Sequence, residues 1–510
     1  MSRNISEKIL SLQDLVKIVS ELKAAGKVVV LSHGVFDLIH PGIINHLELA
    51  KKQGDVLIVT VIRDRDVRRG PGRPIFTDKL RLENVAALEM VDYACTVDDE
   101  IPFEAVRLIN PDILAKGQAY KERDRKIHDK IFEEEKEFYL GKSKVHETGG
   151  FSFSSSQIIN NFLDIYPEET RAFLRGFSQK YSFNDVSAAI DSLKGLKVLL
   201  IGDGIIDEYH YTSAMGKSAK SHLVVSKYLT HEVFYGGSFA IANHLAGICK
   251  EVHLTAVLGM NDSKAEAISA NLKENVTPKF FLRDDGPTIV KKRYIDQYLN
   301  QKIFEVNYIN DDFIGAECEQ AIIDHIKSVA AGYDMVLVSD FGHGLITKRI
   351  KSAIQKNAVR YAVNTQTNAA NAGYNMITKY NSPFFVCLDE PEIRLAAQDR
   401  YGNIEEIAKS IKNAINAKNL IVTLGKKGSI GIDSEGSVNL TPIFSSKVVD
   451  TIGAGDAFFS FTAPCFAQGL PLDMISFIGN AVGALAVQII GNKKPVEKYE
   501  LFEFINTILK

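Results

Sequence analysis

Short apolar runs rich in Val and Ile recur along this chain, and each is followed by a polar stretch with helical spacing. Two of them, KVVVL at 27–31 and VLIVTV at 56–61, lie near the N-terminus. Strands that are buried on both faces of a parallel sheet give such continuous apolar runs, because helices cover both faces. We therefore expect an α/β domain here, with β-strands joined by helices.

A second set of apolar runs predicts another α/β domain. These runs are LKVLLIGD (196–203), MVLVSD (335–340), FFVCLD (384–389) and LIVTLG (420–425). Between the two sets the chain is polar and helix-prone, with Pro167 and an acid pair near a plausible helix start. We expect a domain over 1–160, a helical linker over 161–195 and a domain over 196–510.

Composition narrows the function. The 510 residues include 60 basic and 63 acidic side chains, so no overall charge favours nucleic acid or an anionic membrane as a partner. Five well-separated cysteines fit a reducing compartment. The start, MSRNISEKIL, has no apolar signal-peptide core, and no run approaches the length of a membrane span. We expect a cytoplasmic protein.

The segment 448–461 (VVDTIGAGDAFFSF) has the features of a phosphate-binding turn at the start of a helix. Gly453, Ala454 and Gly455 lack bulky side chains, so their N–H groups can converge on a phosphate at the positive end of the helix. Asp456 in the first helical turn could accept the proton of an attacking hydroxyl group. For these four residues alone, a glycine-rich turn with a capping aspartate is the alternative interpretation.

The motifs around this turn resemble those of the ribokinase-like (PfkB) sugar kinases over residues 196–510. Seven motifs occur in the family's order: GDGIIDEY (202–209), GGSFAIANHLAGI (236–248), PTIVKKRY (287–294), SDFGHG (339–344), DEPE (389–392), VTLGKKG (422–428) and DTIGAGDAF (450–458). The resemblance implies a ribokinase-like α/β sheet with a small β lid, ATP as a substrate and Mg²⁺ as a cofactor.

The same resemblance assigns roles to individual residues. Asp456 would be the catalytic base and the amides of 453–455 an anion hole. The sugar pocket would include Asp207, Gly236, Gly237 and Asn243, and the nucleotide would lie near Gly425, Gly428 and Asn480. Asp389 and Glu392 would bind Mg²⁺ through water molecules. Taken singly, each of these residues also fits a tight turn or a solvated loop.

Some positions depart from the related heptose kinases. Asn364-Thr365-Gln366 replaces an Asp-Pro-Lys sequence, and His343 replaces a lysine. Lys220, with Lys217 nearby, replaces an acid in a segment expected to cover the sugar, which predicts contact with an anionic sugar. Simple exposure to solvent is the alternative for these lysines. The Gly-Lys-Ser sequence at 216–218 lacks the upstream glycine of a Walker phosphate loop.

In the N-terminal region, GVFDLIHPGIINHL (34–47) is similar to the cytidylyltransferase-like signature Gly-x-Phe-Asp-x-x-His-x-Gly-His. His40 matches the first histidine, whereas Ile43 occupies the position of the second. The resemblance places a nucleotide, CTP or ATP, near Gly34, Phe36, Asp37, Gly42, Lys116, Ser154, Ser155 and Ser156. Arg81 is a weaker candidate, because a lone arginine on a helix is usually solvated.

Together the two halves resemble the bifunctional heptose kinase/adenylyltransferases, with the halves in reversed order. This implies a Rossmann-like nucleotidyltransferase followed by a sugar kinase, acting on a sugar or sugar phosphate and a nucleoside triphosphate to make an activated nucleotide sugar for surface polysaccharide. A homodimer is possible on this basis. Two alternatives remain: a kinase with a non-catalytic nucleotide- or partner-binding module, suggested by Ile43, and a wholly non-catalytic scaffold, which the intact Gly-Ala-Gly-Asp sequence disfavours.

Overall fold

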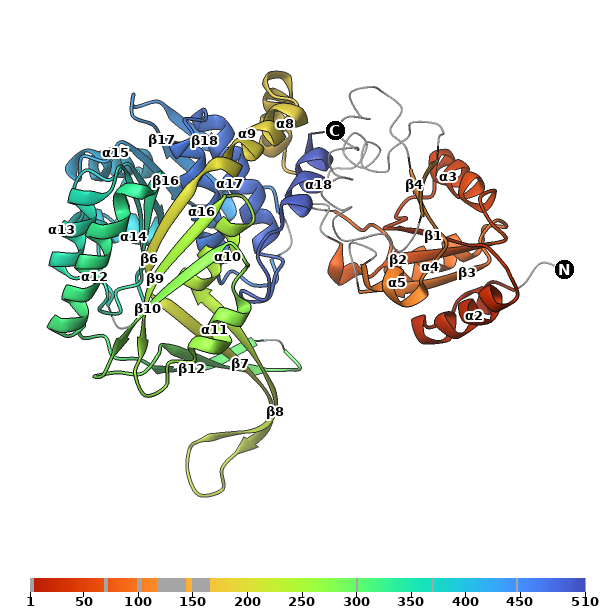
Figure 1. The fold of residues 1–510 in the computed structure, drawn as a ribbon, viewed down its shortest axis with the longest axis horizontal. Helices are drawn as coiled ribbons and strands as arrows, with labels where there is room; N and C mark the ends of the chain where they lie inside the picture. The colour runs from red at the N-terminus through yellow and green to blue at the C-terminus, as the bar shows by residue number, and fades with distance from the viewer. Residues whose placement is uncertain are drawn as a thin grey trace. The chain divides into compact units, whose positions relative to one another are not determined.

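The computed structural model describes residues 4–67, 72–98, 103–117, 144–148, 166–299, 301–368, 371–445 and 448–509. The chain forms two compact units, and Figure 1 follows it by colour. One unit comprises Met1–Asn184 with Lys498–Lys510, and the other comprises Asp185–Glu497. The last helix, α18 (Lys498–Ile508), therefore groups with the first unit, whereas its residues were expected in the second domain.

Five parallel strands form the sheet of the first unit, in the order β3-β2-β1-β4-β5. They are β1 (Val29–Gly34), β2 (Val56–Ile62), β3 (Tyr93–Val97), β4 (Ile113–Gly117) and β5 (Lys144–Thr148). The described helices are α1 (Ile5–Lys8), α2 (Leu12–Ala24), α3 (Pro41–Lys51), η1 (Asp64–Asp66), α4 (Asp78–Ala86), α5 (Phe103–Ile109) and α8 (Glu168–Lys180). The strand order reverses between β1 and β4, and ligands of open α/β sheets bind beyond the carboxyl ends of the strands at such a point.

Apolar side chains fill both faces of this sheet. On one face, Leu15 of α2 and Ile109 of α5 pack in the same cluster as Leu31 of β1. On the other face, Leu47 of α3 and Val85 of α4 belong to a second cluster with residues of β1 and β2. Because the strands are covered on both sides, they read in the sequence as the continuous apolar runs noted above.

The second unit contains a nine-stranded sheet of order β10-β9-β6-β13-β14-β15-β16-β17-β18, parallel as far as β16. Its strands are β6 (Lys197–Gly202), β9 (Glu251–Gly259), β10 (Val276–Arg283), β13 (Met335–Asp340), β14 (Tyr361–Thr365), β15 (Phe385–Asp389), β16 (Asn419–Thr423), β17 (Ser429–Ile432) and β18 (Val438–Thr441). The predicted runs at 196–203, 335–340, 384–389 and 420–425 thus correspond to β6, β13, β15 and β16.

Helices cover both faces of this sheet (Figure 1). They are α9 (Phe183–Asp191), α10 (Ser238–Ala246), α11 (Ala265–Asn271), α12 (Ala316–Val329), α13 (Lys348–Asn357), α14 (Glu390–Ala397), α15 (Ile404–Ala414), α16 (Ala454–Ala467) and α17 (Leu472–Ala486), with the 3-10 turns η2 (Ser192–Gly195), η3 (Ala330–Gly332), η4 (Ile377–Lys379) and η5 (Gly425–Lys427). The helices α12 to α15 bury a row of isoleucines, among them Ile322, Ile350, Ile393 and Ile411, in one large cluster with the strands.

A second, four-stranded sheet of order β12-β11-β7-β8 forms the predicted lid. Its strands are β7 (Gly204–Lys217), β8 (Val224–Gly237), β11 (Val290–Asp296) and β12 (Gln301–Tyr308). Only Asp203 separates β7 from β6, so the lid grows from the carboxyl end of the main sheet. The apolar-run pattern missed β12 because every residue of this strand is exposed. None of the described helices is long and apolar enough to cross a membrane.

Candidate active sites

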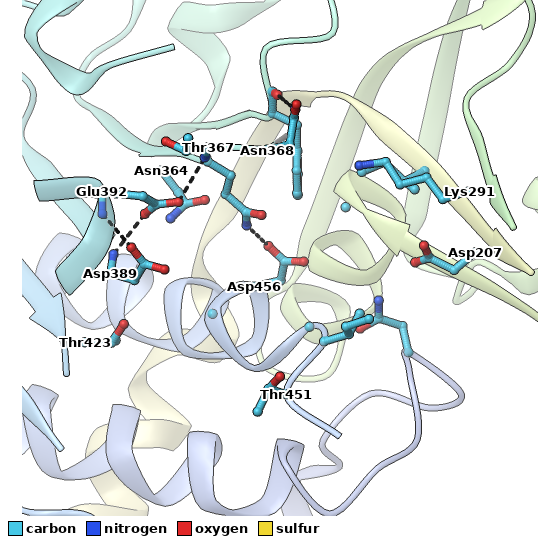
Figure 2. A pocket seen from close by; sticks show the side chains of 18 of the residues that line it. Asp207, Lys291, Asn364, Thr367, Asn368, Asp389, Glu392, Thr423, Thr451 and Asp456 are labelled. Atoms are coloured by element: carbon cyan, nitrogen blue, oxygen red, sulfur yellow. Dashed lines mark hydrogen bonds between the residues drawn. The ribbon is translucent and has the colours of Figure 1, made fainter. Parts of the chain in front are cut away.

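A cavity of about 380 Å³ opens at the carboxyl ends of β13 to β16 in the second unit. Figure 2 shows the side chains that line it, which come from these strand ends, from the lid strands and from the start of α16. Seven of the residues predicted from sequence line this one cavity: Asp207, Gly237, Asp389, Glu392, Gly453, Gly455 and Asp456. The fold therefore brings together motifs that are far apart in the chain.

The first turn of α16 forms one wall of the cavity. Gly453 is the N-cap residue and has a left-handed backbone, with φ of 82°. A Cβ atom on Gly453 would lie 2.0 Å from Oδ1 of Asn492, so a larger residue would displace that side chain. Gly455 lines the cavity in the first turn, where a helix leaves N–H groups unpaired and its dipole is positive. The N–H of Ala454 instead donates to the carbonyl of Thr451, at 3.3 Å.

Asp456 lies in the same turn and is only 5% exposed. Nε2 of Gln366 donates to its Oδ1 at 2.8 Å. The dashed line that ends at Asp456 in Figure 2 marks this bond. Burial raises the pKa of Asp456 to about 7, and the Asp207 charge adds to this rise, whereas the Gln366 hydrogen bond and the charge of Lys291 oppose it. A carboxyl group with a pKa near neutrality can both take and release a proton during turnover.

Alternate side chains of the lid strands face the cavity. Arg293 of β11 forms an ion pair with Asp207 of β7 and another with Glu305 of β12, the latter at 2.7 Å. Lys291, two residues before Arg293, is 8% exposed and lines the cavity, but its ammonium group makes no ion pair or hydrogen bond with the residues that the structure describes. Burial lowers the pKa of Lys291. Lys292 between them pairs with Glu208 at 3.2 Å.

The acid pair Asp389 and Glu392 begins α14 as a capping box. Oδ1 of Asp389 accepts from the N–H of Glu392 at 2.8 Å, and Oε2 of Glu392 accepts from the N–H of Asp389 at 2.9 Å. Oε1 of Glu392 accepts from the N–H of Thr367 at 3.2 Å (Figure 2). Burial and then the neighbouring Asp389 raise the pKa of Glu392 to about 8. Two carboxyl groups held this close, with raised pKa values, fit a site for a cation.

Two other predicted sugar-pocket residues have different surroundings. Gly236 lies directly against Asp207, since a Cβ atom at this position would be 2.6 Å from Oδ2 of Asp207. Asn243 of α10 lies outside the cavity lining. Its Nδ2 donates to the carbonyl of Asn271 at 3.0 Å and its Oδ1 accepts from the N–H of Lys273 at 2.9 Å. These hydrogen bonds hold α10 against the segment before β10.

The residues predicted to contact the nucleotide of the kinase gather where β16 turns into β17. Gly425 opens the turn η5 and Gly428 follows it, while Nδ2 of Asn480 donates to Oγ of Ser429 at 2.6 Å. Thr423, which ends β16, lines the cavity. Gly425, Gly428 and Asn480 thus lie beyond the cavity, on the side of Thr423.

Lys220 lies away from the cavity. It is exposed, in the turn that joins β7 and β8, and its N–H donates to Oγ of Ser218 at 3.2 Å. Both strands run for 14 residues and carry this turn far from the body of the unit (Figure 1). Gly216 pairs with Val225 in the same hairpin. The Gly-Lys-Ser sequence therefore forms no phosphate loop, as the sequence indicated.

Lys291, Arg293 and Gln366 line the cavity but were not among the site residues predicted from the sequence. The alternation in KKRY was the available signal, because side chains two apart on a strand share a face. The neighbours of Gln366 are structural: Nδ2 of Asn364 donates to the carbonyl of Cys387 at 2.9 Å. His343 is buried and its Nδ1 lies 2.7 Å from Oδ1 of Asp311.

In the first unit, the turn after β1 leads directly into α3. His40 is the N-cap residue of this helix, and its Nδ1 accepts from the N–H of Gly42 at 3.1 Å. The proton of the neutral ring therefore lies on Nε2. Burial lowers the pKa of His40, which favours this neutral form. Gly34 ends β1, and Phe36 has a positive φ of 51°, so the turn is sharp.

Asp37 and Arg81 hold this turn in place. The carboxylate of Asp37 accepts from the N–H groups of Ile75 and Phe76 at 2.8–2.9 Å. Arg81 is fully buried rather than solvated, and it donates to the carbonyls of Val35, Phe76 and Ile62 and to Asp64. Both side chains thus bond to the protein itself, and the contacts of Arg81 use four of its five N–H donors.

Ile43 lies in the first turn of α3 and packs against the apolar cluster that contains Phe36 and Leu47. This packing explains how the helix tolerates an apolar residue at the signature position. Lys116 directly precedes the last residue of β4, beside the end of β1. Ligands of such a sheet are expected to bind at this edge. Ser154, Ser155 and Ser156 lie outside the described residues.

A chain of hydrogen bonds joins α3 to the end of β4. Oγ1 of Thr148 donates to the carbonyl of Lys116 at 3.1 Å, and Nδ1 of His46 lies 2.5 Å from this hydroxyl. Nε2 of His46 lies 2.8 Å from Oγ of Ser32. Since the Thr148 proton is used, His46 must donate through Nδ1 and accept through Nε2. Burial lowers the pKa of His46 to about 4, in agreement with a neutral ring.

His46 should make the first unit sensitive to acid. The pKa of His46 is lower in the folded state than in the unfolded chain. Its contribution to the free energy of unfolding is therefore fully present above about pH 6.5 and is lost as the pH falls toward about 4. The total loss is roughly 3 kcal/mol. Hydrogen exchange of β1 and α3 amides at pH 7.5 and pH 5 measures this loss. The variant His46→Gln should show a weaker pH dependence, and an unchanged dependence would exclude His46 as its source.

Comparison with known proteins adds the family context. The sequence model of the pfkB family carbohydrate kinases matches residues 196–498, and that of the cytidylyltransferase-like family matches residues 31–161. The bifunctional protein HldE of Trichlorobacter lovleyi is 24% identical over 300 residues, which is 58% of this chain and 60% of that protein. The HldE of Desulfatibacillum aliphaticivorans is 40% identical over 156 residues, 30% of this chain and 31% of that protein.

Each of these matches spans less than two thirds of the relative's own length. Phosphofructokinase-2 from Escherichia coli, in complex with potassium, superposes with a TM-score of 0.50 at 15% identity, over 61% of this chain and 99% of that one. This likeness shows the ribokinase-like fold of the second unit. The comparisons place the cytidylyltransferase-like segment first and the kinase segment second, and they do not support the expected reversal of order relative to the bifunctional relatives.

Proposed function

The chain belongs to the pfkB family of carbohydrate kinases, and we propose that its second unit phosphorylates a hydroxyl group of a heptose-like sugar phosphate with ATP. The observation that carries this proposal is that the buried Asp456, in the first turn of α16, lines the same cavity as the glycines of that turn. We further propose that the first unit couples the resulting sugar phosphate to a nucleotide, giving an activated nucleotide sugar.

In the proposed kinase step, the acceptor hydroxyl lies against Asp456 and the γ-phosphoryl group lies at the first turn of α16. Asp456 takes the hydroxyl proton while the hydroxyl oxygen bonds to phosphorus, and ADP leaves with the electron pair of the broken bond. The N–H of Gly455 and the helix dipole stabilise the negative charge of the transferring group. Positioning and electrostatics thus supply the catalysis.

Asp389 and Glu392 fit a magnesium ion that is bound through water and nucleotide phosphates. Three of their oxygens are used by backbone N–H groups, and the described residues contain no cluster of three His, Cys, Asp or Glu side chains that could hold a metal directly. Magnesium, when bound with ATP, neutralises charge on the phosphates. Magnesium in ATP-dependent phosphoryl transfer is typically held by one or two carboxylates, water and the substrate phosphates.

The proposed sugar is anionic because of Lys291. A lysine buried at the cavity wall without a carboxylate partner is costly unless a ligand supplies the counter-charge. A phosphate on the sugar would do so, with a charge-assisted hydrogen bond. The anionic preference that the sequence suggested through Lys220 is therefore proposed here for Lys291 instead.

In the first unit, we propose that His40 and Lys116 contact the triphosphate. Nε2–H of His40 is directed by its Nδ1 bond to Gly42, and Lys116 lies near the end of β4 where the strand order reverses. A side chain that donates to developing charge contributes about 100- to 1,000-fold in rate, so a site that lacks the second histidine should be slow rather than inactive. The nucleotide would be ATP or CTP.

The variant Ile43→His should raise nucleotidyl transfer by up to about ten-fold, because the added imidazole would lie one turn from His40 at the helix N-terminus. The gain is limited because Ile43 packs partly in the apolar cluster, and its loss should destabilise the unit by about 1 kcal/mol. Pyrophosphate release from ATP or CTP with a sugar 1-phosphate measures the effect. His40→Ala should abolish the gain, and a gain that survives it would place the chemistry elsewhere.

A second candidate function for the first unit is binding without catalysis, and the packing of Ile43 into the core favours it. In that case the nucleotide binds, and pyrophosphate release stays at background in wild type and in Ile43→His alike. Calorimetry with a non-hydrolysable nucleotide shows whether the nucleotide binds, and pyrophosphate release then distinguishes binding alone from catalysis.

We also propose that the chain forms a homodimer through the outer face of the lid. Stacked rings form a row across four strands on this face, Phe304 with Tyr294 at 4.5 Å, Tyr294 with His210 at 5.1 Å and His210 with His231 at 5.2 Å. Phe304 is 53% exposed, which favours burial against a partner. Sedimentation of wild type and Phe304→Lys tests this, since only the wild type should be dimeric.

The kinase proposal is tested by ADP release with ATP, Mg²⁺ and a panel of heptose, hexose and pentose phosphates, each compared with the free sugar. We expect release only with a phosphorylated sugar. Release that is independent of any sugar, or none with any of them, would contradict the proposal.

A further inference from the structure

Gln366 lies between the proposed base and the acid pair, and its backbone is held from both sides. Its N–H donates to the carbonyl of Asp340 at 2.9 Å, and its own carbonyl accepts from Nδ2 of Asn375 at 3.0 Å. The next residue, Thr367, donates its N–H to Glu392. With the backbone fixed, the side chain of Gln366 enters the cavity from a defined point.

The amide of Gln366 contacts one oxygen of the base and not the other. Nε2 donates to Oδ1 of Asp456, whereas Oδ2 accepts no hydrogen bond from the residues that the structure describes. Since the carboxylate also sits on a rigid helix, this one bond fixes its rotation about the Cβ–Cγ axis. The unused Oδ2 is then available to a hydroxyl group in the cavity.

We infer that Gln366 is a positioning residue for Asp456, which orients the carboxylate so that Oδ2 meets the acceptor hydroxyl. This inference rests on the proposed kinase function. In the step, the hydroxyl proton moves to Oδ2, the new O–P bond forms, and ADP departs. An uncharged donor suits the task because it orients the carboxylate and still leaves it basic, whereas a cation at the same place would hold it ionised and make it a weaker base.

Charged and titratable groups from other elements also act on Asp456. Asp207 of β7 raises the pKa of Asp456, and Lys291 of β11 lowers it. The charge of Asp456 in turn contributes to the raised pKa of the buried Cys387 thiol on β15. These groups are unchanged in variants of Gln366. A change in the pH profile of such a variant can therefore be assigned to the bond between Gln366 and Asp456.

The test compares Gln366→Leu and Gln366→Lys in sugar-dependent ADP release from pH 5 to pH 9. Gln366→Leu should lower kcat about ten-fold, leave the KM for ATP within about three-fold, and move the acid limb of the kcat profile upward. Gln366→Lys should move that limb downward by about one unit or more, because a cation favours the carboxylate. Gln355→Leu removes amide bonds to Tyr361 and Asn381 outside the cavity and should change none of these values.

A double-mutant cycle shows whether Gln366 acts through Asp456. In the Asp456→Asn background, Gln366→Leu should have no further effect on kcat, because the oriented group is already lost. Multiplicative losses, or a Gln366→Leu enzyme with wild-type kcat and pH profile, would overturn the inference. Wild type without sugar-dependent ADP release would instead overturn the proposed function. If Gln366→Leu fails to fold, the direction of the Gln366→Lys shift decides.

Discussion

Asp456→Asn should lower sugar-dependent ADP production at least about a hundred-fold, with little change in the KM for ATP. The amide is close in size to the carboxylate and can keep the contact with Gln366, but it cannot take the proton of the attacking hydroxyl group. The first turn of α16 keeps its backbone, so the phosphoryl group should still bind. The loss therefore falls on kcat.

The raised pKa of Asp456 predicts the pH dependence of the wild type. The base must be ionised to act, so kcat should be high above about pH 7 and should fall as the pH drops below that value. This acid limb should be absent from the residual activity of Asp456→Asn. A variant with activity within a few-fold of wild type, or one that keeps the limb, would remove Asp456 from the role of base.

Asp473→Asn is the matched control. Asp473 also lies in the first turn of a helix, α17, but outside the residues that line the cavity. Its variant removes the same charge from a comparable position relative to a helix dipole, so it should change stability slightly and kcat by less than about two-fold. An equal loss of kcat in both variants would point to a general electrostatic effect.

Lys291→Met should raise the KM for a phosphorylated sugar about thirty-fold while the KM for ATP stays within about three-fold. The methionine keeps most of the buried volume and removes the ammonium group, so the lost quantity is one charge-assisted contact of about 1.5–3 kcal/mol. Initial rates with sugar phosphate and with the corresponding free sugar measure the effect. The free sugar should be used equally poorly by both enzymes.

Lys292→Met provides the control for this prediction because it is the neighbouring lysine on the same strand. Its ammonium group pairs with Glu208 on the face of the lid opposite to Lys291 and lies 5.0 Å from the ring centre of Tyr308. We expect a wild-type KM for the sugar phosphate. If Lys291→Met and Lys292→Met behave alike, the lid contributes only general positive charge, and the assignment of Lys291 to the substrate phosphate is wrong.

Several features of the cavity could be predicted from the sequence. Gly453 and Asp456 belong to one short segment in which conformation and chemistry are local, since a glycine with positive φ and the start of a helix need only neighbouring residues. The acid pair Asp389 and Glu392 is likewise three residues apart and forms its own capping box. Such local patterns are visible in the sequence without the fold.

Other residues could not be assigned without the structure. Lys220 and Lys291 are both lysines of the lid, and only the length of the β7–β8 hairpin shows that the first is exposed and remote. Asn243 was expected in the sugar pocket, and Arg81 was expected to be solvated. Both instead form hydrogen bonds with segments that are distant in the sequence. Partners of that kind depend on packing, which no local pattern reports.

The sequence by itself determined the two α/β parts and the glycine turn at the start of α16, because strand burial, helix spacing and glycine conformation depend on nearby residues. The lid was expected only from the resemblance to the PfkB kinases, since the exposed strand β12 gives no apolar run. Only the tertiary structure decided which side chains share the cavity and what each one meets there. Gln366 reaches Asp456 across 90 positions of the chain, and Lys291 lies without a carboxylate partner among the described residues. Long-range packing sets such distances and burial, and through them the pKa values on which the proposed chemistry depends.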